Sequence, residues 1–559
     1  MYCITEPYVA PTGTAVSAIH RNSQSQESGQ VRWWACALLL AAHWLATPPM
    51  EPVFNGDENR HVMTSVFFRD VMTDRPVDNL QTYAKDYYEQ YPALGLLIWP
   101  PLFHGMAGLA MTIFGTSVQV PRVLVFLSFV GATWCLQRIC RRRMETEQAW
   151  FVATVFAVTP LVFEFSRYVM LEMPTLALCL VCLDQFDVWL ARDQKRHLFS
   201  AALAAAFAAL TRFDAIVLLP MLLLFATFEG RWRRLADRQI AFAAVTALLL
   251  VAPTYFVIWS EMGELHLRQA AESVSGRDRP SGVLERILFY PSQIPEQIGW
   301  VATVFVVTGL LSCLRKEHRA AVPAFGAILI ATFVTFTPLA ELTSRHTIYW
   351  LPSLAWLASI GAIEASRYAA SRSTVSLRNL RAAIPMAFLL AATAAHSFTL
   401  PPHQVSGYAR AVQAAITHSE PGDSILIEGW WDGNLTYHLR HLDPRRSRHV
   451  IRADKELYDF TNVPNVDFRQ FVRTDAEILA AIARLNPQCI VFEDPQPYGT
   501  IEISRQMRRL IRSRSDLFSH VKTVPVSSTV PNARQFSLHV FVVNPRGIDR
   551  VKKQRKMYM

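Results

Sequence analysis

Long apolar runs recur along the chain, and they constrain its fold more than any other feature. Several approach the roughly 20 residues that an α-helix needs to cross the hydrocarbon core of a bilayer. Hydrophobic residues make up 51% of the sequence and charged residues 18%, below the roughly 25% of an average soluble domain. The sequence therefore predicts several membrane spans and one soluble part. The runs lie at about 33–49, 94–114, 119–137, 148–165, 174–190, 198–210, 215–228, 239–259, 298–314, 320–339, 347–364 and 382–399.

Basic residues gather in short clusters between these runs, and such clusters mark cytoplasmic loops. All the clusters can share one side only if the run at 94–115, which contains Pro100-Pro101, does not cross the bilayer. We interpret it as a re-entrant or juxtamembrane helix on the outer face, which leaves about eleven spans. The alternative is that 94–115 crosses and the hairpin at 198–228 is misread. The clusters lie at Arg32, 138–143, 192–196, 231–238, 315–319 and 367–381.

Composition divides the chain into four parts. Residues 1–30 are rich in Ser, Gln, Pro and Gly, which predicts a flexible cytoplasmic tail and not a signal peptide. Residues 31–399 form the predicted α-helical polytopic membrane domain, with a first outer loop at 51–118. Residues 400–545 are expected to form a small extramembrane α/β domain on the periplasmic side, and 546–559 a basic tail. The net charge of +10 comes mainly from the clusters between spans, so we expect no nucleic acid partner.

The C-terminal region alternates between two kinds of short segment. "DSILIEGWW", "CIVFEDP" and "LHVFVVN" are apolar and bounded by turn residues, which predicts strands. "TDAEILAAIARLN", with a capping residue at Thr474, and "EISRQMRRLIRSRSDLF" have helical periodicity. No Gly-rich phosphate loop follows the first strand, so we do not expect a nucleotide site in this domain.

Polar residues near the ends of the apolar runs gather on the predicted outer side. Carboxylates and cations beside membrane-embedded walls suit a lipid-linked anionic substrate. The candidates are Asp57 and Glu58 in the first outer loop, Glu172 in "SRYVMLEMPT", Arg212 at the tip of the 198–228 hairpin, and Arg345 with His346 before "TIYWLP".

Each candidate also has a structural interpretation. The acids at 57, 58 and 172 could cap helices, because carboxylates are favoured at helix N-termini. Arg345 and His346 could anchor a helix among lipid headgroups. Arg212 could pair with Asp214, two residues further on. The residues alone leave these alternatives open.

A series of short motifs follows one order along residues 30–365. An anchor is followed by "DENRHV", "YPALGLLIWPPLF", "PRVLVFL", "SRYVMLEMPTLAL", "ALTRFDAIVLLP" and "SRHTIYWLPSLAWLASIGA". This order resembles bacterial glycosyltransferases of the GT-C superfamily, the group around the protein O-mannosyltransferases and the lipid A aminoarabinose transferase. The resemblance implies a GT-C membrane domain with juxtamembrane helices in its first outer loop.

The resemblance also implies roles for individual residues. Asp57 matches the catalytic acid of the first loop and Glu58 its partner, while Glu172 matches a second-loop acid that is often Asp in the family. Arg345 matches the basic residue that commonly precedes the late "YxxP" stretch. Trp99 replaces a common basic or His residue, so no phosphate contact is carried over there. Nothing is carried over to the C-terminal domain.

These features together predict a glycosyltransferase, hexosyl or pentosyl, in the bacterial inner membrane. Its donor would be a sugar on a polyprenyl phosphate, and its acceptor a hydroxyl of a protein, lipid or glycan at the outer face. Asp57 would act as general base with inversion at the sugar, and Arg345, with His346 or Arg212, would bind phosphate. A divalent cation held by Asp57 and Glu58 is an option without being required. The alternatives are a transporter or flippase for a lipid-linked or anionic substrate, and a membrane-anchored scaffold.

Overall fold

The computed structural model describes residue 51 and residues 57–549, apart from short gaps. All of these residues belong to one structural unit, Pro49–Met559. The predicted tail at 1–30, the first apolar run at 33–49 and the end of the basic tail lie outside the described residues. The gaps are 77–78, 276–281, 314, 340–341, 374–377, 460–468, 498–500, 531–532 and 534.

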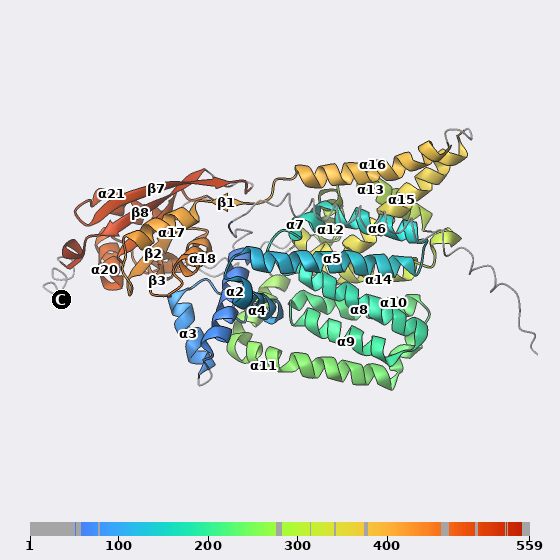
Figure 1. The fold of residues 1–559 in the computed structure, drawn as a ribbon, viewed down its shortest axis with the longest axis horizontal. Coiled ribbons are helices and arrows are strands. Elements are labelled where there is room, and N and C mark those ends of the chain that lie inside the picture. Colours follow the sequence, from blue (N-terminus) through green and yellow to red (C-terminus); the bar gives the residue numbers. More distant parts are fainter. Residues whose placement is uncertain are drawn as a thin grey trace, which may run out of the picture. The chain divides into compact units, whose positions relative to one another are not determined.

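Each predicted apolar run within the described residues contains a helix (Figure 1). Within the described residues, five helical segments are long and apolar enough to cross a membrane, namely 119–141, 172–192, 238–267, 344–371 and 378–399, and four shorter apolar segments accompany them. The number of crossings therefore stays a prediction. The helices are α5 (Gln119–Arg141), α6 (Thr146–Ala157), α7 (Pro160–Phe165), α8 (Glu172–Arg192), α9 (Lys195–Ala209), α10 (Leu218–Phe228), α11 (Arg238–Ser275), α12 (Val283–Ile298), α13 (Trp300–Ser312), α14 (Val322–Phe336), α15 (Leu351–Ser371) and α16 (Arg378–Thr399), with 3₁₀ segments η2 (Phe213–Val217), η3 (Trp232–Ala236), η4 (Lys316–His318) and η5 (Ser344–Trp350).

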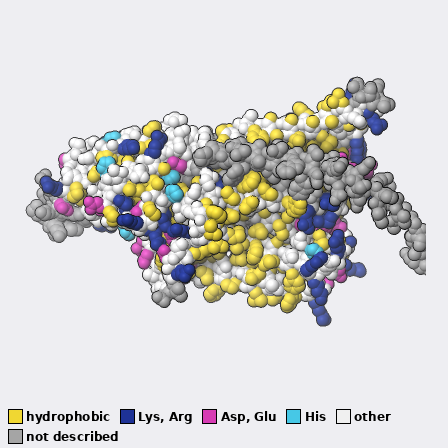
Figure 2. Space-filling view, in the orientation of Figure 1, with side chains coloured by type: hydrophobic (Ala, Val, Ile, Leu, Met, Phe, Trp, Pro, Cys, Tyr) yellow, Lys and Arg dark blue, Asp and Glu magenta, His cyan; other side chains and the backbone are white. Residues whose placement is uncertain are grey.

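Basic side chains collect at one end of the helical domain (Figure 2). Arg143, just after α5, bonds Asp187 near the end of α8 at 2.7 Å and Glu229 after α10 at 3.3 Å. At the end of α15, Glu364 pairs with both Arg315 and Arg367. The clusters after α5, α13 and α15 thus lie at the same end, as the charge pattern predicted.

Three helices that precede α5 lie at the opposite end: α2 (Asp57–Asp74), α3 (Leu80–Gln90) and α4 (Leu102–Phe114). The 13 residues of α4 span about 20 Å, less than the roughly 30 Å of a hydrocarbon core. Its first amide, on Leu102, donates to the Leu210 carbonyl just beyond α9, and Thr116 after it contacts His441 of the C-terminal domain. The start of α4 thus lies against the end of α9 and the residue after it contacts the C-terminal domain, while its placement as a juxtamembrane helix stays a prediction.

The C-terminal domain is built on a six-stranded sheet of order β1-β7-β8-β6-β2-β3. Strand β2 runs parallel to its neighbours β3 and β6, and the remaining pairs are antiparallel. Apolar side chains from strands and helices, such as Leu426, Ile482, Phe492 and Met507, form its core. The elements are β1 (Val405–Ser406), α17 (Tyr408–Thr417), β2 (Ser424–Glu428), α18 (Asp432–Leu442), β3 (His449–Arg452), α19 (Ala453–Glu456), α20 (Asp475–Leu485), β6 (Cys489–Asp494), α21 (Glu502–Ser513), β7 (Phe518–Ser528) and β8 (Phe536–Val543), with a small ladder of β4 (Tyr458–Asp459) and β5 (Arg469–Gln470).

The three predicted strands are β2, β6 and β8, and the two predicted helices are α20 and α21. Thr474 caps α20 as expected, because its hydroxyl accepts from the Glu477 amide while the Glu477 carboxylate accepts from the Thr474 amide. The sequence prediction did not include β3, β7, α17 or α18.

Candidate active site

A cavity of about 570 Å³ lies between the helical domain and the C-terminal domain. On the helical side, α2 contributes two charged side chains, η5 contributes one, and α11 contributes apolar side chains. On the other side, the loops that follow β2, β3 and β6 supply polar and aromatic groups. The principal lining residues are Asp57, Arg60, Tyr88, Trp99, Met262, Leu265, Arg345, Trp430, Asp432, Arg452, Asp454, Lys455, Tyr458 and Gln496.

Asp57 is the first residue of α2, where the helix dipole favours a carboxylate. Its Oδ2 accepts a hydrogen bond of 3.0 Å from Nη1 of Arg345 in η5. The Asp57 side chain is 19% exposed and that of Arg345 24%, so both remain accessible from the cavity. The structure thus brings together the two residues that sequence reasoning ranked as base and phosphate ligand.

Arg60 is a cavity residue that sequence reasoning missed. It lies three residues after Asp57 on α2, and side chains at that spacing share one helix face. Asp57 and Arg60 both line the cavity, as does Arg345. The helical wall therefore carries one carboxylate and two guanidinium groups. The three-residue spacing within "DENR" would have indicated Arg60 as a neighbour of Asp57, had a helix been predicted to begin at Asp57.

Glu58 is turned away from the cavity, because successive helix residues differ by about 100° in direction. It is fully buried, and its Oε1 accepts from Arg122 Nη2 of α5 and from the Val169 amide, each at 3.0 Å. The two adjacent carboxylates therefore have separate partners. Asp57 and Glu58 do not form the converging pair of oxygen ligands that a shared divalent cation would need.

Glu172 and Arg212 form a second buried group away from the cavity lining. Glu172 begins α8 and accepts from Arg212, whose Nε also donates to Asp214 Oδ2 at 2.6 Å. The ion pair between Arg212 and Asp214, which was the structural alternative at this position, is therefore present. His346 does not line the cavity either, and its ring stacks on Phe336 with centroids 5.6 Å apart.

Trp99 lines the cavity and packs against the buried His61, which in turn contacts the buried His104. Its ring centroid lies 4.3 Å from that of His61, and His61 Nδ1 lies 3.0 Å from Nε2 of His104. Burial, followed by the nearby charges of His104 and several arginines, holds the pKa of His61 well below its usual range. Gly95 allows the indole to pack closely, because a Cβ there would lie 2.2 Å from it. The indole thus takes a packing role at the position where the family commonly has a basic residue.

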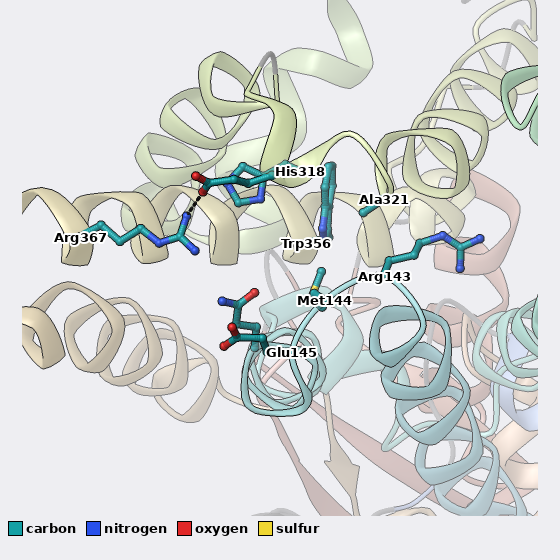
Figure 3. A pocket seen from close by; sticks show the side chains of 9 residues that line it. Arg143, Met144, Glu145, His318, Ala321, Trp356 and Arg367 are labelled. Atoms are coloured by element: carbon teal, nitrogen blue, oxygen red, sulfur yellow. Dashed lines mark hydrogen bonds and ion pairs between the residues drawn. The ribbon is translucent and has the colours of Figure 1, made fainter. Parts of the chain in front are cut away.

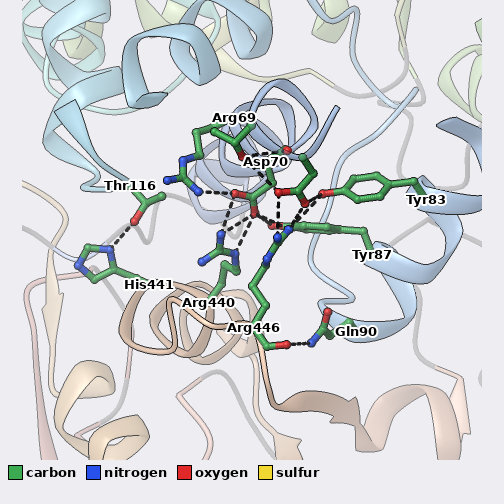
Figure 4. A network of polar contacts seen from close by, with 11 residues as sticks. Arg69, Asp70, Tyr83, Tyr87, Gln90, Thr116, Arg440, His441 and Arg446 are labelled. Carbon is green, nitrogen blue, oxygen red and sulfur yellow. Dashed lines mark hydrogen bonds and ion pairs between the residues drawn. The ribbon is translucent and has the colours of Figure 1, made fainter. Parts of the chain in front are cut away.

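A buried ion pair attaches the C-terminal domain to α2 (Figure 4). Arg440 of α18 donates from Nε and Nη2 to the carboxylate of Asp70 at 2.7–2.9 Å, and the Tyr87 hydroxyl adds a bond of 2.7 Å. Nearby, Arg446 pairs with Asp74. The helix that begins with Asp57 is thus held directly by the domain that forms the opposite cavity wall.

A second, smaller cavity of about 240 Å³ lies at the basic end of the helical domain (Figure 3). Next to it, Glu317, His318 and Glu364 have ligand atoms within 4.8 Å of one another, the one such group among the residues that the structure describes. Arg315 and Arg367 both donate to Glu364, and Arg367 also pairs with Glu317. These ion pairs already account for the cluster, so we assign no metal to it.

Comparisons with known proteins agree on the fold. Residues 99–259 match the family model described as dolichyl-phosphate-mannose-protein mannosyltransferase. The crystal structure of ArnT from Cupriavidus metallidurans bound to undecaprenyl phosphate is similar, with a TM-score of 0.58 and 15% identity over 92% of this chain and 98% of that chain. The apo form of the same protein gives a TM-score of 0.59 with the same identity and coverage. No curated protein sequence matches the chain.

The chain is thus a multi-pass membrane protein with the fold of the GT-C superfamily of glycosyltransferases. The predicted fold class, a helical polytopic membrane domain followed by a small extramembrane α/β domain, is confirmed, as is the predicted resemblance. The boundaries at 31–399 and 400–545 stay predictions, and so do the roles of individual site residues.

Proposed function

We propose that this protein transfers a sugar from a polyprenyl-phosphate donor to a hydroxyl acceptor, with Asp57 as general base. One observation carries the proposal: the Asp57 carboxylate lines a large cavity together with Arg60 and Arg345. The base for the acceptor and the positive charge for a phosphate then lie side by side. A cavity of this composition suits a phosphate-linked donor whose leaving group is an anion.

The wall at α11 supports a lipid-linked donor. This helix has 38 residues and is about 57 Å long. Phe242, Leu249 and Phe256 on it are more than half exposed, as expected of side chains that face lipid, and Met262 and Leu265 further along line the cavity. A polyprenyl chain in the bilayer could follow this apolar surface to the cavity. The undecaprenyl phosphate bound in the ArnT structure is a polyprenyl phosphate and so belongs to this chemical class.

The transfer would be a single displacement. The acceptor oxygen attacks the anomeric carbon as the bond from that carbon to the phosphate oxygen breaks, and Asp57 takes the hydroxyl proton. The polyprenyl phosphate departs as an anion, stabilised by Arg345 and Arg60. Base catalysis of this kind contributes about 10²–10⁴-fold to the rate, and one displacement inverts the anomeric configuration.

The remaining predicted site residues receive supporting roles in this proposal. Glu58 positions α2 through Arg122, and Glu172 with Arg212 fixes the start of α8 against the loop before η2. We assign His346 to packing beside Arg345. The proposal needs no metal at Asp57 and Glu58, since the two carboxylates have different partners.

We also propose that the cavity faces the periplasmic side of a bacterial inner membrane. The basic clusters lie at the other end of the helical domain, and such clusters favour the cytoplasm. This orientation places the N-terminal tail inside and the C-terminal domain outside. Membrane-impermeant labelling of a cysteine introduced at the exposed Glu89 of α3 tests it, because labelling is expected from the periplasm alone.

The competing class is a transporter or flippase for the same lipid. Purified protein in vesicles, supplied with labelled polyprenyl-phosphate sugars and a mixture of hydroxyl acceptors, separates the two. A glycosyltransferase moves the label to an acceptor and releases polyprenyl phosphate. A flippase moves intact donor across the bilayer without forming product, and that result would contradict the proposal.

A further inference from the structure

The far wall of the cavity is formed by the carboxyl ends of three adjacent parallel strands. Strands β6, β2 and β3 lie side by side in that order and point the same way. Trp430 and Asp432 follow β2, Asp454 and Lys455 follow β3, and Gln496 follows β6, and all five line the cavity. In open α/β sheets, ligands bind outside the carboxyl ends of the strands. The C-terminal domain therefore presents the edge of its sheet that is suited to binding.

The loop after β2 is held in a fixed shape. The Glu493 carboxylate accepts from the amides of Trp430 at 2.7 Å and Trp431 at 3.0 Å, and from the Tyr408 hydroxyl at 2.7 Å. Gly429 has no side chain to obstruct this contact, whereas a Cβ there would lie 2.4 Å from Cδ of Glu493. The groups on this loop are thus preorganised before any ligand arrives.

One polar group in the wall lacks a protein partner. Gln496 is 2% exposed, and its Nε2 donates to Oε1 of Glu428 at 2.5 Å. Its Oε1 has no hydrogen-bond partner in the described part of the chain. An unsatisfied buried acceptor costs about 1–3 kcal/mol. A ligand hydroxyl that donates to this oxygen would recover that free energy.

Carboxylates outnumber cations in the ion pairs of this wall, unlike on the helical side. Arg452 is held by Asp432 and Asp454 at 2.6 Å each, and Lys455 bonds Asp459 at 2.8 Å. Among the described residues of this wall no cation is in excess, whereas the helical wall has Arg60 and Arg345 for one carboxylate. A phosphorylated acceptor would call for an excess of guanidinium groups. The wall instead offers carboxylate and amide oxygens next to the aromatic rings of Trp430, Tyr88 and Tyr458.

We infer that this wall is the acceptor subsite and that the acceptor is a neutral glycan. Sugar hydroxyls would donate to Gln496 Oε1 and Asp454, and the C–H faces of a sugar ring would lie on the aromatic rings, whose faces carry partial negative charge. The inference rests on the proposed transfer. A sugar hydroxyl of the glycan gives its proton to Asp57, its oxygen forms the new glycosidic bond, and polyprenyl phosphate leaves with the bonding electrons.

Acceptor competition tests the inference on the full-length protein in nanodiscs. Labelled polyprenyl-phosphate mannose and polyprenyl-phosphate arabinose are offered as donors. Neutral hexose tetrasaccharides, Ser/Thr-containing peptides and lipid A are offered together as acceptors. We expect the label on the tetrasaccharides. Label on peptide or lipid A alone overturns the inference, and so does donor hydrolysis without transfer to any of the three acceptors. In both cases the donor is still consumed, so the proposed use of a polyprenyl-phosphate donor is not contradicted. If neither donor is consumed, the proposed function fails and the inference fails with it.

A pair of variants tests the subsite itself. Gln496→Met keeps the length of the side chain and removes its hydrogen-bonding groups, while Gln413→Met makes the same change at an exposed position of α17. We expect Gln496→Met to raise the KM for the tetrasaccharide at least tenfold, and to raise the KM for the donor much less. Gln413→Met should match the wild type. Equal acceptor KM values for Gln496→Met and wild type would contradict the inference.

Discussion

Arg345 donates a hydrogen bond of 3.0 Å to Asp57 although 288 positions separate them in the sequence. The contact joins the start of α2 to η5, so an early and a late segment of the chain meet at one cavity. A bound phosphate would compete with the Asp57 carboxylate for the same guanidinium. Donor binding and release of the base for catalysis are therefore coupled in the proposed mechanism.

Replacement of Arg345 tests the charge on the leaving phosphate. We expect Arg345→Gln to lower kcat by about 10²–10³-fold, the range found when one group that stabilises developing negative charge is removed. Arg345→Lys should retain part of the activity, because it keeps the charge and loses the planar fork. Steady-state transfer rates measure both. Arg141→Gln, an exposed change at the other end of the helical domain, is the matched control, and equal effects at the two positions would argue against a local role.

Substitutions in the buried pair of Glu58 and Arg122 test whether Glu58 has a structural role. Glu58→Gln leaves a buried guanidinium without its carboxylate, a change that costs about 3–5 kcal/mol in comparable buried pairs. The yield of folded protein should fall sharply. The double variant Glu58→Gln/Arg122→Met removes both charges and should recover folding and transfer. Fluorescence-detected size exclusion and transfer assays measure the two effects. A well-folded but inactive double variant would instead assign Glu58 to the chemistry.

Glu493 predicts how stability depends on pH. Burial raises its pKa from the usual 4.5 to about 7, although bonds from Tyr408 and the amides of Trp430 and Trp431 oppose the shift. The folded protein therefore holds a proton that the unfolded chain has lost, so stability falls as pH rises from about 4.5 to about 7. The loss amounts to about 3 kcal/mol. Thermal unfolding across this pH range should show a smaller decline for Glu493→Gln than for the wild type, and parallel declines would contradict the assignment.

Patterns local in sequence predicted most of the fold. Apolar runs of span length marked the helices, and the capping pair of Thr474 and Glu477 marked the start of α20. The prediction that the run at 94–115 does not cross the bilayer depends on the charge of loops far from it, because one misplaced crossing would invert every later cluster. Strands β3 and β7 were not predicted. His449–Arg452 is short, and β7 contains Pro525, which counts against a strand in a sequence pattern.

The site was harder to predict, because its geometry depends on partners distant in sequence. The spacing within "DENRHV" places Asp57 and Arg60 on one helix face, but nothing in it indicates that Glu58 contacts Arg122, 64 positions away. The resemblance identified Asp57 and Arg345 but carried nothing over to the C-terminal domain. The cavity residues of the C-terminal domain are brought together by the aligned carboxyl ends of three parallel strands, and the sequence does not show that alignment.

The most direct test of the proposed function is the transfer rate of Asp57→Asn. This change removes the base and preserves the size of the side chain. Asp86→Asn, the same change at an exposed position of α3, is the control. With labelled polyprenyl-phosphate sugar as donor, we expect Asp57→Asn to lose at least about 10²-fold in kcat while it elutes as folded protein, and Asp86→Asn to match the wild type. Near-normal transfer by folded Asp57→Asn would contradict the assignment of Asp57 as general base.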